Sequence, residues 1–153
     1  MILAFFGLMT CAANAAPSGL ALGAQLGEPV AATVSYRWHP SMTVHLSQGW
    51  SFGQKRMHTS IDYQYTVTEI PAEDGMGLSY PVYVGTGLRI RAFGPGGSAS
   101  DEAQSFGFRF PVGAAGSPHH IPLEVYFEMA PVWVVAPVSR GGFDGGIGGR
   151  LFF

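Results

Sequence analysis

The feature of this sequence that most limits its fold is a regular alternation of apolar and polar residues, clearest between residues 57 and 67. The odd positions carry Met57, Thr59, Ile61, Tyr63, Tyr65 and Val67, and the even positions carry His58, Ser60, Asp62, Gln64 and Thr66. Successive side chains of a β-strand point to opposite faces of the sheet. An alternation of period two therefore predicts a strand with one apolar face and one polar face.

The same alternation recurs in eight segments, and residues that favour turns separate them. Each segment is close to the roughly 9–11 residues that a tilted strand needs to cross a bilayer. An even number of strands, with both termini at one end, predicts an up-and-down barrel. We therefore expect an all-β fold, an eight-stranded antiparallel transmembrane barrel over residues 17–153. The predicted strands are residues 18–26, 30–38, 42–52, 56–68, 81–93, 105–115, 122–135 and 142–153.

The composition agrees with a barrel whose outer surface faces lipid. Charged residues make up 12% of the chain, and glycine occurs 22 times in 153 residues. Average soluble domains have about 25% charged residues and about 7% glycine. A lipid-facing surface needs few charges, and glycine suits tight turns and close wall packing. The net charge of −2 and the lack of a Lys/Arg run argue against a nucleic-acid partner.

Residues 1–16 have the pattern of a secretory signal peptide. An apolar stretch from Met1 to Met9 is followed by small residues, and the Ala-Asn-Ala sequence at 13–15 offers a cleavage site. We expect this segment to direct export and then to be removed. Cys11 is the only cysteine, so cleavage would leave a mature chain without a disulfide or a reactive thiol.

The rest of the chain contains no candidate for a membrane-spanning helix, which needs about 18 or more apolar residues in a row. The nearest stretch, residues 125–138, is interrupted by Glu128, Pro131 and Pro137. A chain that spans a membrane with strands must close them into a barrel, because open sheet edges are unstable in lipid. The alternation also fits a soluble β-sandwich, but that fold would have to cover an apolar face on every strand.

The alternation places the charged residues of the strands on the polar face, which in a barrel is the interior. The predicted interior residues are the acids Asp62, Glu124, Glu128 and Asp144 and the arginines Arg89, Arg91, Arg109 and Arg150. Unpaired buried charges cost several kcal/mol each, so equal numbers of the two signs predict a charge-paired interior. From the expected strand directions, the predicted pairs are Glu124–Arg150, Glu128–Arg109 and Asp62–Arg89.

The apolar face is expected to point outward to lipid. Trp38, Trp50 and Trp133 fall near strand ends on this face, and membrane barrels collect aromatic residues at the two interfaces. The residues predicted to point outward include Trp38, Trp50, Ile61, Phe127, Met129, Ile147 and Leu151.

The last strand carries a resemblance to a known group of proteins. Apolar residues occupy alternate positions up to a terminal aromatic residue, and the matching residues are Phe143, Ile147, Leu151 and Phe153. This pattern resembles the terminal assembly signal of bacterial outer-membrane barrels, which implies contact with the outer-membrane assembly machinery during biogenesis. Gly145 and Gly149 depart from it, because bulkier apolar residues are usual there.

The number and length of the predicted strands resemble the OmpA and OmpX class of eight-stranded barrels. Residues 123–131, together with the last strand, also resemble a family of small outer-membrane proteins to which no activity is assigned. These resemblances imply an outer-membrane location in a Gram-negative bacterium. They imply the lipid bilayer as the surroundings, a monomer, and no cofactor.

Few residues form a pattern that indicates chemistry. His58 and Ser60 have the His-x-Ser spacing of outer-membrane lipid A deacylases, but both are predicted to face the interior, away from acyl chains. His119 and His120 are adjacent in a turn without a clear third ligand, which is below the usual number for a metal site. We expect no catalytic site and no metal.

The expected function is therefore that of a non-catalytic structural or interaction barrel of the outer membrane. An eight-stranded barrel has an interior that side chains just fill, so it is a poor pore. Two alternatives remain open. One is a periplasmic barrel that binds a lipid or a small apolar molecule, and the other is a lipid A-modifying enzyme.

Overall fold

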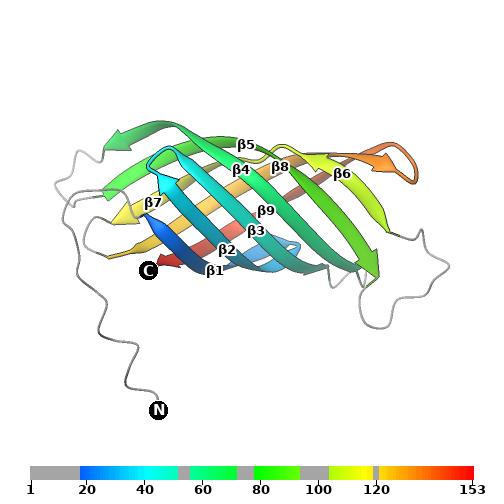
Figure 1. The fold of residues 1–153 in the computed structure, drawn as a ribbon, viewed down its shortest axis with the longest axis horizontal. Helices are drawn as coiled ribbons and strands as arrows, with labels where there is room; N and C mark the ends of the chain where they lie inside the picture. Colours follow the sequence, from blue (N-terminus) through cyan, green and yellow to red (C-terminus); the bar gives the residue numbers. More distant parts are fainter. Residues whose placement is uncertain (1–17, 52–55, 72–77, 94–103, 119–120) are drawn as a thin grey trace, which may run out of the picture.

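The computed structural model describes residues 18–51, 56–71, 78–93, 104–118 and 121–153. These residues form a single antiparallel sheet (Figure 1), and within them no helix is long and apolar enough to span a membrane. The predicted signal peptide, Cys11, His119 and His120 lie outside the described residues. The strands are β1 (Gly19–Glu28), β2 (Val30–His39), β3 (Met42–Ser51), β4 (Arg56–Pro71), β5 (Leu78–Phe93), β6 (Ser105–Arg109), β7 (Val112–Pro118), β8 (Leu123–Ala136) and β9 (Arg140–Phe152).

The sheet closes on itself because its first and last strands pair with each other. β1 is hydrogen-bonded to β2 on one side and to β9 on the other, and the antiparallel pairing continues around the ring. The predicted up-and-down barrel is thus confirmed. We call the end of the barrel that holds Gly19 and Phe152 the terminal end. The opposite end, which holds Glu28 and Arg140, is called the distal end.

β6 and β7 together form one strand of the wall, because both pair with β5 on one side and with β8 on the other. Phe110 and Pro111 separate them, and a proline has no N–H to donate to the ladder. The Pro111 oxygen still accepts a hydrogen bond from Gly85 N at 2.7 Å, and Phe110 N donates to Pro131 O at 3.0 Å. The predicted strand at 105–115 is therefore divided, and the eight predicted strands are found as nine segments.

Paired neighbours trace a row of apolar side chains once around the barrel. The row contains, in order, Leu123, Leu151, Leu22, Val34, Leu46, Ile61, Leu88, Phe108 and Trp133. It leaves β8 at Leu123 and returns to β8 at Trp133. This offset means that the strands are tilted against the barrel axis, as closure of a sheet requires. The row also means that every strand of the wall contributes an apolar side chain to the outer surface.

The two faces of the wall have opposite characters. On β4, the side chain of Ile61 is 49% exposed, while that of Asp62 is 0% exposed. On β8, Phe127 is 48% exposed and Glu128 is 0% exposed. The buried face is thus polar and the exposed face is apolar, which is the reverse of a soluble β-sandwich. The residues predicted to point outward, Trp38, Trp50, Ile61, Phe127, Met129, Ile147 and Leu151, are all exposed or partly exposed.

Glycines on the inner face make room for large side chains of the neighbouring strand. Gly148 lies opposite Tyr126 in the ladder, and Gly113 lies opposite Tyr83. A Cβ atom at either glycine would collide with the ring of the facing tyrosine. The interior therefore holds two tyrosine rings because the opposing positions have no side chain, which accounts for part of the high glycine content.

β4 and β5 are the longest strands, with 16 residues each, and at the terminal end they exceed the predicted bounds of 56–68 and 81–93. Glu69 pairs with Pro81 and Ile70 with Tyr80, after a register shift between Thr66 and Thr68. The shift interrupts the alternation, and proline is usually a sign that a strand has ended. The apolar–polar alternation in the sequence therefore ends before β4 and β5 reach their terminal-end limits.

Candidate functional site

The most prominent feature of the interior is a network of charged side chains centred on Arg109 of β6. The guanidinium of Arg109 contacts acids from three other strands: Asp62 of β4, Glu128 of β8 and Asp144 of β9. Its NH2 atom lies 2.6 Å from Glu128 Oε1, and its Nε atom lies 3.5 Å from Asp144 Oδ2. Asp144 also forms an ion pair with Arg89. We call these five residues the central cluster.

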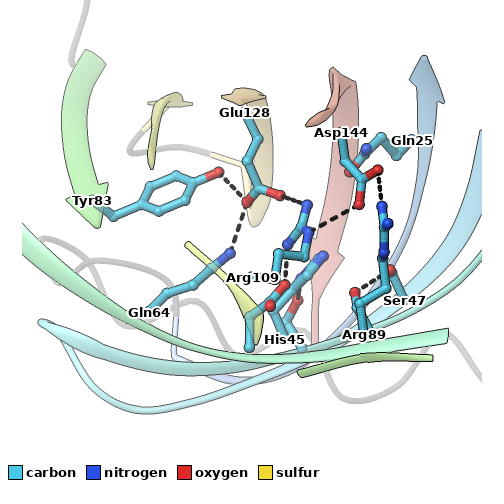
Figure 2. A network of polar contacts seen from close by, with 12 residues as sticks. Gln25, His45, Ser47, Gln64, Tyr83, Arg89, Arg109, Glu128 and Asp144 are labelled. Atoms are coloured by element: carbon cyan, nitrogen blue, oxygen red, sulfur yellow. Dashed lines mark hydrogen bonds and ion pairs between the residues drawn. The ribbon is translucent and has the colours of Figure 1, made fainter. Parts of the chain in front are cut away.

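Neutral side chains complete the surroundings of Glu128. Gln64 Nε2 and the Tyr83 hydroxyl each donate a hydrogen bond of 2.9 Å to Glu128 Oε2. Figure 2 shows Gln64 and Tyr83 pointing at this carboxylate, and Asp144 between Arg109 and Arg89. Each oxygen of Glu128 thus accepts at least one hydrogen bond, which compensates for its removal from water.

A second cluster lies nearer the terminal end and is centred on Glu124. Arg37 NH2 lies 2.9 Å from Glu124 Oε2, and Arg150 Nε donates to Glu124 Oε1 at 2.7 Å. Arg150 NH1 also donates to Ser35 Oγ at 3.2 Å. The Arg37 guanidinium stacks over the Phe152 ring at 4.7 Å from its centre. We call Glu124, Arg37 and Arg150 the terminal cluster.

Burial makes these contacts matter for stability. Asp62, Glu124 and Glu128 are 0% exposed, and each forms an ion pair with at least one guanidinium. A buried charge without a partner costs several kcal/mol, so the acids and arginines are mutually dependent. Arginine suits this role, since its planar fork presents donors to two carboxylates at once.

Two of the three predicted pairs are in contact in the structure. Glu124 lies directly opposite Arg150 in the ladder between β8 and β9. Glu128 and Arg109 lie on the adjacent strands β8 and β6, where Arg109 is the ladder partner of Val132, and the Arg109 side chain reaches the Glu128 carboxylate. The sequence placed all four of these residues on the inner face, and the structure has them there.

The predicted pair of Asp62 with Arg89 is wrong. Asp62 lies opposite Gly87 in the ladder and pairs with Arg109. Arg89 lies opposite Ser60 and reaches across the lumen to Asp144 of β9. In so narrow a barrel a long side chain can span the interior, so neighbours on adjacent strands are not necessarily partners.

Arg37 is not among the predicted interior residues, and Arg91 has no predicted partner. Arg37 obeys the alternation of its strand, because Thr33 and Ser35 precede it on the inner face and all three are buried. Arg37 lies next to Trp38 and the following turn, where the alternation is harder to recognise. Arg91 is half-buried on β5, opposite His58 in the ladder.

The His58–Ser60 pair does not have the arrangement of a nucleophile and its base. Ser60 Oγ lies 2.8 Å from Ser47 Oγ, and neither ring nitrogen of His58 has a hydrogen-bond partner among the described residues. In the same part of the chain, no group of three or more His, Cys, Asp or Glu side chains could hold a metal ion.

The predicted interface aromatics lie on the outer wall at both ends of the barrel. Trp38 is at the terminal end, where its ring lies 6.3 Å from that of Tyr36 and 6.0 Å from that of Tyr63. Trp50 and Trp133 are at the distal end, and both are exposed. The predicted assembly residues Phe143, Ile147, Leu151 and Phe153 lie along the outer face of β9 and just beyond it.

Comparisons with known proteins give one informative result. No protein-family model matches the chain, and no curated protein matches it significantly in sequence. Among solved structures, the chain is similar to the crystal structure of the N-terminal β-barrel domain of Pseudomonas aeruginosa OprF. The TM-score is 0.58 at 16% sequence identity, over 88% of this chain and 95% of that one. The chain therefore has the fold of the OprF N-terminal barrel domain.

Proposed function

We propose that this protein is a non-catalytic structural or interaction barrel of a bacterial outer membrane, inserted as a monomer and largely filled by its own side chains. The observation that carries the proposal is the closed ring, with apolar side chains outward from every strand of the wall and charged side chains inward. Such a surface is unstable in water and stable in the hydrocarbon core of a bilayer. The fold that the chain shares with the N-terminal β-barrel domain of Pseudomonas aeruginosa OprF supports a closed barrel.

The crowded interior supports a structural role over that of an open pore. The central and terminal clusters span the lumen from wall to wall, and the rings of Tyr83 and Tyr126 occupy space between them. A solute would have to displace Arg109 from three carboxylates at once. An eight-stranded barrel is in any case narrow enough for side chains to fill.

Membrane fractionation tests the location. The full chain, expressed in a Gram-negative host, is expected in the outer-membrane fraction, resistant to carbonate extraction and with heat-dependent migration in detergent gels. A periplasmic ligand-binding barrel would instead be found in the soluble fraction, and that result would overturn the proposal.

Planar-bilayer recordings test the filled interior. The refolded protein is expected to give no stable conductance steps at neutral pH, whereas an Arg109→Ala variant with intact heat-dependent migration is expected to give small ones. Steady large-conductance openings of the unaltered protein would contradict a filled lumen.

A further inference from the structure

A group of polar side chains lies at the distal end of the lumen and shares only Arg89 with the central cluster. The inner face of β4 brings Arg56 and His58 to this end, and the inner face of β5 brings Arg89 and Arg91. His58 is the ladder partner of Arg91, and Ser51 of β3 is the partner of Arg56. These five residues, which we call the distal cluster, therefore line one side of the lumen.

The distal cluster contains buried hydrogen-bond donors that are not used. Ser51, His58 and Arg89 are 2%, 3% and 2% exposed. Within the described ranges, Ser51 Oγ, both ring nitrogens of His58 and the NH2 atom of Arg89 have no hydrogen-bond partner. Buried polar groups are almost always hydrogen-bonded. Ser51, His58 and Arg89 lie on the consecutive strands β3, β4 and β5, and each has at least one donor without a partner among the described residues, which indicates that an acceptor belongs between them.

The surrounding charges give the sign of that acceptor. Arg91 interacts electrostatically with Arg89, Arg56 and Arg140, and Asp144 is the one acid among these neighbours that is described. Asp144 is already engaged by Arg89 and Arg109. The described part of this end of the lumen is thus rich in positive charge, and an anion is the acceptor that it favours.

We propose that the distal cluster binds a small phosphate-type oxyanion. A tetrahedral oxyanion has enough oxygens to accept hydrogen bonds from Ser51, His58 and Arg89 together, and Arg56 and Arg91 supply further positive charge. These side chains lie on the inner face of the wall, where Ser51, His58 and Arg89 are buried. A lipid phosphate stays on the outer side of the wall, so a free anion fits the position better. This site goes beyond the structural role proposed above and does not depend on it.

The first test titrates the refolded protein in nonionic detergent with inorganic phosphate, against potassium chloride of equal ionic strength. Side-chain NMR signals of His58 and Arg89 are expected to shift in a saturable way, and those of Arg150 in the terminal cluster are expected not to. Ser51→Ala removes one hydrogen bond to a charged group, so it is expected to weaken phosphate binding about tenfold.

Ser117→Ala is the matched control, because Ser117 is another buried serine without a hydrogen-bond partner among the described residues, near the terminal end. It is expected to leave phosphate affinity unchanged, and heat-dependent migration checks that both variants are folded. Absence of saturable shifts beyond the chloride control, or equal effects of the two serine variants, would overturn the proposal.

A second test separates free anions from lipid head groups. In phosphate-free buffer, the His58 signal is expected to be the same in phosphatidylcholine nanodiscs with and without phosphatidylglycerol. A shift caused by phosphatidylglycerol, without one caused by inorganic phosphate, would replace the free-anion site with a lipid contact and refute the inference.

Discussion

At the scale of single residues, replacement of Arg109 is expected to have the largest effect on stability. It is buried and contacts three carboxylates, so its removal leaves three buried acids with less positive charge near them. Removal of one acid leaves Arg109 with two partners. The energetic cost of truncation should therefore be asymmetric within the central cluster.

Arg109→Met is expected to lower the free energy of unfolding by about 3–5 kcal/mol, because it leaves buried charges unpaired. Urea unfolding in detergent or lipid measures this change. A double-mutant cycle with Glu128→Gln should give a coupling energy above about 0.5 kcal/mol. Thr59→Val is the control, since Thr59 forms its 2.7 Å hydrogen bond with Gln48 on the exposed outer wall. Additive effects at Arg109 and Glu128 would mean that the two side chains do not interact.

The inner glycines give a second prediction at this scale. Gly148→Ala would press a methyl group against the Tyr126 ring, whereas a Cβ at Gly141 meets nothing within 4 Å. Overpacking of a rigid interior costs about 1–3 kcal/mol. Gly148→Ala is therefore expected to destabilise the barrel by that amount, and Gly141→Ala is expected to change stability by less than about 0.5 kcal/mol. Equal unfolding midpoints for the two variants would exclude the proposed tyrosine–glycine packing.

The sequence predicts which face a residue occupies better than it predicts the residue's partner. Alternation of period two puts Asp62, Arg89 and Asp144 on the inner face, where they are. It contains no information on which arginine crosses the lumen, because that depends on side-chain reach and on barrel diameter. This is why the predicted pair of Asp62 with Arg89 is wrong, although both residues lie on the predicted face.

At the scale of secondary-structure elements, strand positions were more predictable than strand ends. The division between β6 and β7 depends on Pro111, whose effect on the ladder is local. Because both β6 and β7 pair with β5 and β8, the two segments stay in one strand of the wall. The extension of β4 beyond Thr66 follows a register shift. Both features arise from pairing between strands, which a single-strand pattern does not contain.

β4 provides a test of membrane depth. Ile61 is mid-strand and Met57 is nearer the distal end on the same outer face. Arginine facing lipid costs about 2–4 kcal/mol at the bilayer midplane and about 0–1 kcal/mol near the interface. Ile61→Arg is therefore expected to destabilise the protein in lipid by clearly more than Met57→Arg, as judged by urea unfolding in vesicles. If the two variants unfold at the same urea concentration, β4 does not cross the bilayer as proposed.

β9 provides a test of assembly. Phe153 is exposed just beyond the strand, where its N–H donates to Leu20 O at 2.8 Å. Deletion of Phe153 is expected to lower the amount of protein in the outer membrane and to leave export unchanged, because the terminal aromatic resembles an assembly signal and not an export signal. Fractionation and immunoblotting measure both quantities.

Phe153→Tyr keeps an aromatic terminus and is expected to behave like the unaltered protein. If the outer-membrane level is unchanged after the deletion, β9 does not carry the assembly signal.

At the scale of the whole molecule, the protein is organised around a polar interior. Charge pairs and hydrogen bonds between distant strands take the place of the apolar core of a soluble domain, and the surrounding lipid is expected to cover the apolar side chains. The fold was predictable because alternation, turn spacing and low charge content all favour the same closed arrangement. The interior network was predictable only as a set of residues, since its connections form after closure.

The pairing of β1 with β9 has a consequence for the timing of folding. β1 precedes the other described strands in the sequence and pairs with β9, which follows all of them, so the wall cannot be completed until β9 is present. Until then every partial sheet has unpaired edges that invite association with other chains. Closure of the barrel therefore waits for β9, and truncation before β9 leaves β1 with an open edge.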